Sequence, residues 1–317
     1  MIASWTRSFA RCARRSGRAP RPGVTGMILA IVSAAGFSTL PVLYKYSFSL
    51  GATTTGVLAW RFCIASALML IYCCARRLSL RTDRATAVRV ALIGSVGYGG
   101  FSWLYSTSVR FIPAWVATML FSVYPVATAL IAGPALGERL DRAKVRAMII
   151  SLLGCAFIVW APALGGGIQR LDIRGVVMAL AAGVSYAAYS VVSRRIVAGL
   201  QPVVMSTYVM LWGAGFYIVG AIVSGDRWVP SAAGSWAAVA SLAVISTAIP
   251  MAALMGALIR IGATRTAILG TSEPLMSAIL AFVFLRERFE WIQAVGAALI
   301  LGSVLVVRKG LGTPDSA

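Results

Sequence analysis

The sequence contains no histidine and few charged residues. Only 12% of its 317 residues are Asp, Glu, Lys or Arg, whereas a soluble globular domain has about a quarter. Without histidine, the chain cannot build a Ser–His–Asp triad or a zinc site with imidazole ligands. Of the nine acidic residues, only Glu273 falls well inside a long apolar run, so paired buried carboxylates for acid–base catalysis are missing. We therefore expect no enzyme, metal site or cofactor.

Disulfides and nucleotide-binding loops are also not expected. The five cysteines, Cys12, Cys63, Cys73, Cys74 and Cys155, all fall within expected helices or on the expected cytosolic side, where thiols stay reduced. The glycine-rich loop that cradles nucleotide phosphates is not found in the sequence, so direct ATP drive is not indicated.

Long hydrophobic runs make up most of the chain. Hydrophobic residues account for 59% of it, and the charged residues divide these runs into intervals near the about 20 residues that a membrane-spanning helix needs. Because the runs lack the alternation of barrel strands, we expect helices. Ten intervals result: 21–45, 45–76, 89–110, 110–138, 146–170, 174–194, 195–226, 227–260, 265–286 and 290–308.

Lysine and arginine are distributed unevenly between the connections of these helices. If the N-terminus is cytosolic, 21 of the 29 basic residues lie on the cytosolic side, seven lie outside, and Arg61 lies within the second helix. Cytosolic loops of membrane proteins are enriched in basic residues. We therefore expect a multi-pass protein of the plasma (inner) membrane with both termini in the cytoplasm.

The net charge of +20 is explained by this topology better than by nucleic-acid binding, because no basic groove or RNA-binding signature accompanies it. Residues 1–24 contain six arginines and no acid, and we expect a disordered cytosolic arm there. A transit peptide or an interfacial helix is the alternative that the arginine spacing allows. Residues 309–317 are expected to form a solvated C-terminal tail.

The chain contains an internal duplication. Gly26 and Gly175, Pro125 and Pro274, and the pairs Glu138–Arg139 and Glu287–Arg288 are each separated by 149 residues. Each copy holds five expected helices, and because five is odd, the second copy must enter the membrane inverted. We therefore expect an all-α integral membrane protein with ten transmembrane helices as two inverted five-helix repeats, residues 26–160 and 175–308. This architecture is typical of secondary transporters.

Three motifs give a resemblance to a known family. They are "SVYPVATALIAGPALGERL" and its copy "TSEPLMSAILAFVFLRERF", the glycine-containing last helices "IISLLGCAFIVW" and "GAALILGSVLVV", and "LAWRFCIASALML" in the second helix. In their order, spacing and duplication they resemble the EamA-type transporters of the drug/metabolite transporter superfamily. The resemblance implies a ten-helix carrier, usually an exporter of small metabolites such as amino acids, with a central cavity.

A carboxylate lies directly before a proline within the ninth expected helix. Glu273 is about nine residues, or about 14 Å, into this helix, and Tyr124 holds the equivalent position in the fourth. Pro125 and Pro274 each leave a carbonyl without its N–H partner, and matching interruptions in both repeats indicate a transporter's site. We expect Tyr124 and Glu273 to border the cavity, with Glu273 binding a cationic group or carrying a coupled proton. The alternative is a protonated Glu273 that only links neighbouring helices.

Arg61 is the other charge within an expected span, about 12 Å deep in the second helix. A salt bridge with Glu273 is one possibility, but we favour a structural role in which Arg61 bonds loose carbonyls or extends towards the membrane surface. Further substrate-binding candidates are polar and aromatic residues at mid-helix positions, each equally open to a packing role. They are Tyr98 and Trp103, Tyr186 and Tyr189, and Ser38, Ser246 and Thr247.

The sequence thus predicts a secondary transporter that works by alternating access and exports an amino acid or a related amphipathic solute. Two alternatives stay open: a non-transporting membrane scaffold or receptor, and a multidrug-type efflux carrier with the same fold. The expected partners are a small-molecule solute, the lipid bilayer and, as one option, coupled protons. Nucleic acid is not expected, and the chain acts as a monomer or a homodimer.

Overall fold

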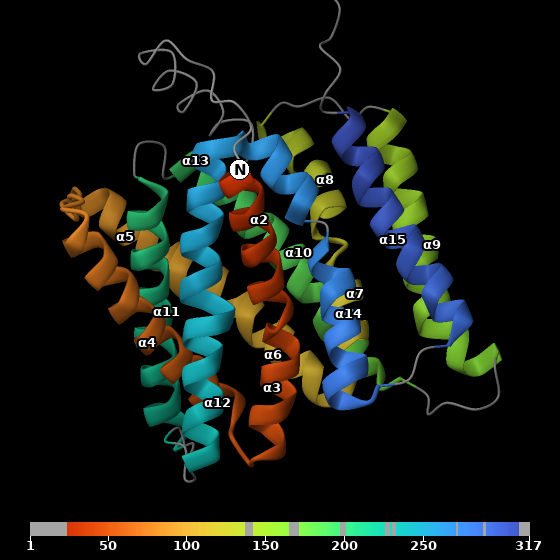
Figure 1. Ribbon diagram of the computed structural model, residues 1–317, viewed down its shortest axis with the longest axis horizontal. Coiled ribbons are helices and arrows are strands. Elements are labelled where there is room, and N and C mark those ends of the chain that lie inside the picture. Colours follow the sequence, from red (N-terminus) through yellow and green to blue (C-terminus); the bar gives the residue numbers. More distant parts are fainter. Residues whose placement is uncertain are drawn as a thin grey trace, which may run out of the picture. The chain divides into compact units, whose positions relative to one another are not determined.

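The computed structural model describes residues 24–136, 142–164, 171–196, 201–225, 229, 233–270, 272–287 and 290–310. All regular structure in these ranges is helical (Figure 1), which confirms the all-α prediction. The basic arm at residues 1–23, Glu138 and the tail beyond Gly310 lie outside the described residues.

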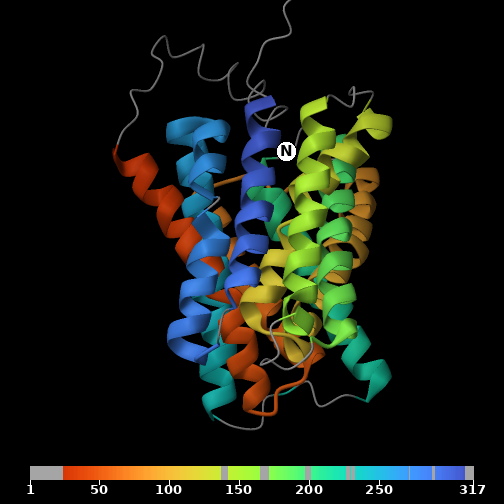
Figure 2. The ribbon, with the colours of Figure 1, turned by 90° about the vertical axis from the view of Figure 1, so that its right-hand side faces the viewer.

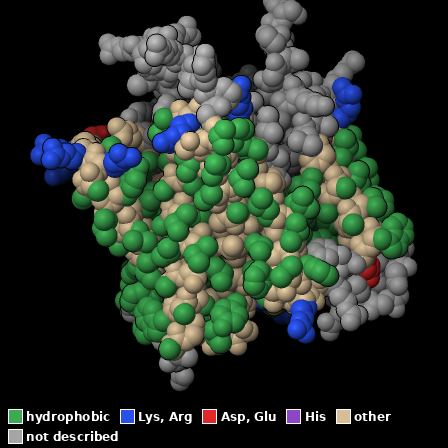
Figure 3. All heavy atoms as spheres, in the orientation of Figure 1, with side chains coloured by type: hydrophobic (Ala, Val, Ile, Leu, Met, Phe, Trp, Pro, Cys, Tyr) green, Lys and Arg blue, Asp and Glu red, His purple; other side chains and the backbone are tan. Residues whose placement is uncertain are grey.

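Six helical segments are long and apolar enough to cross a membrane, judged by length and composition. They are Val24–Ser49, Thr54–Ala75, Ala114–Ala132, Ile173–Ser193, Val203–Val223 and Ala233–Gly262, and shorter apolar helices cover Val145–Trp160, Ser272–Leu285 and Trp291–Ser303. Hydrophobic side chains cover much of the face seen in Figure 3, and Ile222, Val223 and Phe284 are among the large apolar residues that are exposed. Such a surface fits contact with lipid. The count of ten spans stays a prediction.

Contacts divide the chain into two compact units. Unit 1 comprises the described parts of Met1–Gly99 and Val192–Leu280, and in it α2 packs against α13, while α4 packs against α11 and α12 (Figure 1). Its helices are α2 (Val24–Ser38), α3 (Leu40–Ser49), α4 (Thr54–Ala75), α5 (Arg84–Leu92), η1 (Ile93–Gly99), α11 (Pro202–Ser224), α12 (Ala233–Ala243), η2 (Val244–Ala248), α13 (Ile249–Gly270) and most of α14 (Ser272–Leu285).

Unit 2 comprises the described parts of Gly100–Val191 and Ala281–Ala317. Its helices are α6 (Gly100–Phe111), α7 (Ala114–Phe121), α8 (Tyr124–Leu136), α9 (Arg142–Leu164), most of α10 (Ile173–Ile196) and α15 (Trp291–Gly310). In Figure 2, α9 and α15 run side by side. Each unit therefore combines helices from both sequence repeats.

The duplication is visible in contacts within each unit. A Cβ atom added to Gly26 would lie 2.5 Å from Cγ2 of Ile261, and one added to Gly175 would lie 2.7 Å from Cγ2 of Ile112. These two pairs are related by the same 149-residue spacing that relates the sequence motifs. Only glycine permits such close helix packing, so the repeats share a packing contact as well as a pattern.

The fourth expected span is interrupted just before its proline. In unit 2, α7 ends at Phe121 and α8 begins at Tyr124. Pro125 has no N–H to offer the Phe121 carbonyl, and Gly183 of α10 lies against that carbonyl, since a Cβ atom added there would be 2.9 Å from the oxygen.

The ninth expected span is divided between two helices. In unit 1, α13 ends at Gly270 and α14 begins at Ser272, and Thr271 between them lies outside the described residues. An earlier break within α13 falls at Gly262, where φ is 76°. Gly262 is the equivalent of Pro113, which precedes α7. Both spans therefore begin after a break, and in both a helix begins at or directly before the position of Tyr124 or Glu273.

Two π-helices occupy equivalent positions in the repeats. The five residues of η2 (Val244–Ala248) correspond, at the 149-residue spacing, to the last part of η1 (Ile93–Gly99). The sequence explains both locally, because η1 is rich in glycine and η2 is followed by Pro250, which cannot donate a helical hydrogen bond. π-helical turns are rare and occur frequently at functional sites.

Candidate functional sites

Arg61 forms the centre of a buried polar cluster in unit 1. The residue is only 3% exposed. Its Nε donates to the Thr247 hydroxyl of η2 at 2.9 Å, and Nη1 donates to the Tyr44 hydroxyl of α3. Tyr98 of η1 also interacts with the guanidinium. Since Tyr98 and Thr247 are equivalent in the two repeats, both π-helices converge on this one side chain.

Aromatic rings complete the surroundings of Arg61. Its guanidinium carbon lies 5.1 Å from the ring centre of Phe62 and 5.6 Å from that of Tyr44, which is within the range of a cation–π interaction. The Phe62 ring in turn packs against Tyr98 and Tyr217. Among the described residues, no carboxylate forms an ion pair with Arg61, so the charge is stabilised by hydroxyls and ring faces alone.

A second set of hydroxyls lies near this cluster. The Thr39 and Ser246 hydroxyls are 2.6 Å apart, and Thr39 stands at the junction of α2 and α3. Ser38 is buried and donates to the Ala35 carbonyl at 2.7 Å. The sequence candidates Ser38, Ser246, Thr247 and Tyr98 therefore all lie in unit 1.

Unit 2 contains an aromatic cluster. The Tyr186 ring of α10 lies 4.8 Å from Phe101 and 4.9 Å from Tyr124, with its plane nearly perpendicular to both. Phe121 lies 5.3 Å from Tyr124, and Tyr189 packs on Tyr186 at 5.9 Å. Edge-to-face pairs of this kind stabilise packing, and the half-buried Tyr124 and Tyr186 retain some exposure. Trp103 of α6 differs, because 40% of it is exposed.

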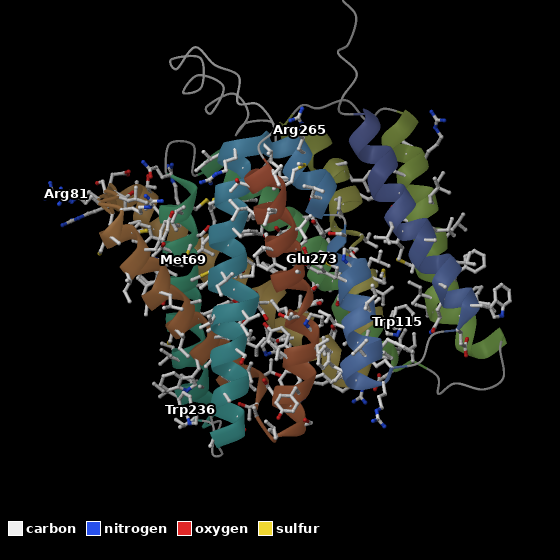
Figure 4. All side chains as sticks on the ribbon, in the orientation of Figure 1. Met69, Arg81, Trp115, Trp236, Arg265 and Glu273 are labelled. Atoms are coloured by element: carbon white, nitrogen blue, oxygen red, sulfur yellow. The ribbon has the colours of Figure 1, made fainter. Side chains whose placement is uncertain are left out.

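Glu273 lies in the first turn of α14 (Figure 4). A helix N-terminus carries partial positive charge, so an acidic side chain is favoured there. The residue is half-buried, and no hydrogen bond or ion pair joins its carboxylate to another described residue. Neither the salt bridge with Arg61 nor a helix-linking bond of Glu273 is found within the described ranges. Tyr124 starts α8 in the same manner.

Sequence reasoning missed several residues of these clusters. Tyr44 lies at the end of the first expected span, which is interrupted at Thr39, and Pro41 near the start of α3 is the signal that could have indicated this break. Phe101 and Phe121 gave no signal, because apolar aromatic residues are common in any span. Arg61 bonds hydroxyls on other helices rather than the carbonyls that we expected.

Sequence reasoning also missed the hydrogen-bond partners of Glu287, because they are distant in sequence. Its carboxylate accepts hydrogen bonds from the backbone amides of Ala114 at 2.8 Å and Trp115 at 3.3 Å. These amides begin α7, where a helix has no internal acceptors for its first N–H groups. Glu287 therefore caps α7 within unit 2.

The chain matches known transporters over most of its length. The model of the EamA-like transporter family matches residues 24–160 and 173–309. Threonine/homoserine exporter RhtA of Escherichia coli (strain K12) is 27% identical over 290 residues, which cover 89% of this chain and 92% of that protein. A probable terminal-alkyne amino-acid exporter of Streptantibioticus cattleyicolor is 30% identical over 267 residues, covering 83% and 86%.

A solved structure supports the fold. A protein of known crystal structure aligns with a TM-score of 0.65 and 22% identity, covering 92% of this chain and 98% of its own. The matching family and the named relatives are transporters. They confirm the expectation of a transporter rather than an enzyme.

Proposed function

Since this chain belongs to the EamA-like transporter family, we propose that it exports a small metabolite, an amino acid or a related amphipathic solute. The observation that carries the proposal is the family match to both halves of the chain, together with two relatives named as amino-acid exporters. In the proposed topology, ten helices form two inverted five-helix repeats, and the repeats open a midplane site alternately to each side.

We place the proposed solute route at the helix interruptions. In unit 1 the route includes Glu273, and in unit 2 it includes Tyr124 with Tyr186. Interrupted helices support this placement, because half-helix ends present unbonded backbone groups and helix dipoles to a solute. Glu273 supports it further, since an acidic side chain within a membrane span is functional by default. Its proposed role is to bind the amino group of the solute or to carry a coupled proton.

The proposed location is the inner membrane with both termini in the cytoplasm. The connection between α4 and α5, together with α5 itself, supports this orientation, because it carries a group of exposed arginines. Arg81 is labelled there in Figure 4; Arg76, Arg77 and Arg81 lie in the connection, and Arg84 and Arg89 lie in α5. Basic connections of this kind stay on the cytosolic side.

Flux across proteoliposomes tests the proposed function. Purified protein is reconstituted into vesicles loaded with radiolabelled threonine, homoserine or other amino acids, and efflux is compared with that from protein-free vesicles. We expect saturable efflux of at least one amino acid. Flux of cationic drugs but no amino acid would favour a multidrug carrier, and no flux over the whole panel would favour a scaffold or receptor.

A further inference from the structure

Arg61 is a buried charge in unit 1 that has only neutral partners among the described residues. It is 3% exposed, and its hydrogen bonds go to the hydroxyls of Thr247 and Tyr44. A guanidinium remains charged at every physiological pH, and burying a charge without a counter-ion is costly. Neutral hydroxyls compensate this cost less well than a carboxylate does, because charge-assisted bonds are stronger.

The Arg61 guanidinium has more N–H donors than hydroxyl partners among the described residues. It carries five N–H groups, and its partners among the described residues are the hydroxyls of Tyr44, Tyr98 and Thr247. The described part of the chain thus offers three hydroxyl partners for five N–H groups. A carboxylate matches the planar fork of arginine by accepting two parallel bonds.

The repeat gives an internal comparison that weighs against a purely structural role. The residue 149 positions after Arg61 is Met210. Met210 is 1% exposed and packs in an apolar cluster with Ala65 and Met69. The second copy of the helix thus folds with an apolar residue at this buried position, so the repeat does not itself require an arginine there.

The partners of Arg61 come from segments suited to rearrangement. Thr247 and Tyr98 are presented by the two π-helices, η2 and η1, and Tyr44 is presented by α3, which follows the interruption at Thr39. π-helical turns occur frequently at functional sites, and transporters form their binding sites from interrupted helices.

We propose that Arg61 binds the carboxylate of the transported solute, and that the hydroxyls of Tyr44, Tyr98 and Thr247 stand in for that carboxylate when no solute is bound. This inference rests on the proposed function and adds to it the residue that selects the solute by its anionic carboxylate. It assigns this selection to unit 1 and to a single residue whose counterpart in the second repeat, Met210, is apolar.

Binding of an isosteric ligand series to the purified full chain tests the proposal. Equilibrium binding is measured for threonine, for threoninamide, which lacks the negative charge, and for 1-amino-2-propanol, which lacks the carboxyl group. Other amino acids with their amides are added if threonine does not bind. We expect the acid to bind the unaltered protein at least about tenfold more tightly than its amide, as for a desolvated charge pair.

Variants of Arg61 connect this preference to the residue. In Arg61→Gln, acid and amide are expected to bind within about twofold of each other, and Arg61→Lys should restore part of the preference. Ser66→Ala, which removes another buried hydroxyl from α4, is the matched control and should keep the full preference. Should Arg61→Gln not fold, Thr247→Val supplies the test, because it frees a donor and should tighten the acid selectively.

The outcomes separate this inference from the proposed function. Amino-acid efflux together with equal binding of acid and amide would refute the proposed role of Arg61 and still support the proposed export function. Arg61-dependent binding of a carboxylate without amino-acid efflux would support the role of Arg61 and refute the proposed export function. No binding by any carboxylate in the panel, or an unchanged preference in Arg61→Gln, would overturn the inference.

Discussion

The cap formed by Glu287 makes the start of α7 sensitive to one substitution. The amides of Ala114 and Trp115 belong to residues that are 0% and 1% exposed, and both donate to this carboxylate. Replacing Glu287 with alanine leaves two buried N–H groups without acceptors. Each unsatisfied group costs about 1–3 kcal/mol, so we expect the free energy of unfolding to fall by about 2–6 kcal/mol, and by about 1 kcal/mol for Glu287→Gln.

The measurement is thermal unfolding in detergent, followed by tryptophan fluorescence. Because large membrane proteins unfold irreversibly, apparent midpoints are compared at one scan rate. The expected loss for Glu287→Ala corresponds to a midpoint lower by about 4–12 °C. Asp172→Asn is the matched control, since Asp172 also stands at a helix start but forms an exposed pair with Arg174 at 2.8 Å and should change little. A Glu287→Ala midpoint within about 1 °C of wild type, or an equal loss in the control, would refute the reasoning.

Three further predictions concern other residues. Glu273→Gln should abolish the pH dependence of efflux if Glu273 carries the coupled proton, and an unchanged profile at unchanged rate would exclude that role. Gly183→Val should lower the yield of folded protein, because a Cβ atom there would lie 2.9 Å from the Phe121 carbonyl, whereas Gly215→Ala, which has open space, should not. Hydrogen bonds from the Thr86 hydroxyl and from the Thr86 amide, which donates at 3.0 Å, lower the pKa of the Asp83 carboxyl. The cap should therefore stabilise α5 above the ordinary Asp pKa of about 4 and lose part of its effect as pH falls through the lowered value, so Asp83→Ala, which removes the accepting oxygen, should destabilise the protein more at neutral pH than in acid.

The sequence was most informative where chemistry and lipid restrict the choice of residue. Apolar runs predicted helices because no other open structure satisfies the backbone in a bilayer. The 149-residue spacing predicted a duplication that Gly26 and Gly175 repeat as packing contacts. Pro125 marked a span that is interrupted in the structure just before Tyr124, and Pro274 follows Glu273 in the first turn of α14. The proposed binding roles of the sequence candidates stay predictions.

Long-range contacts were beyond the reach of sequence patterns. Nothing in the periodicity of α4 says that Arg61 meets Thr247, because this pairing depends on how α4 and η2 are packed. The same holds for Glu287 and the start of α7. π-helices were also missed, since Gly and Pro mark irregular backbone without specifying which irregularity forms. The cost of burying a carboxylate can be judged from its place in an apolar run, but its hydrogen-bond partner depends on how the helices pack.

The mixing of the two repeats within unit 1 has a consequence for biogenesis. During translation, α2 and α4 emerge long before α13 and α11, the helices against which they pack. The nascent protein must therefore hold these early spans in the bilayer with their final neighbours still unmade. Tyr44 and Tyr98 are synthesised close to Arg61, so they can hydrogen-bond to its guanidinium early. The hydrogen bond to Thr247 can form only when the second repeat has been inserted.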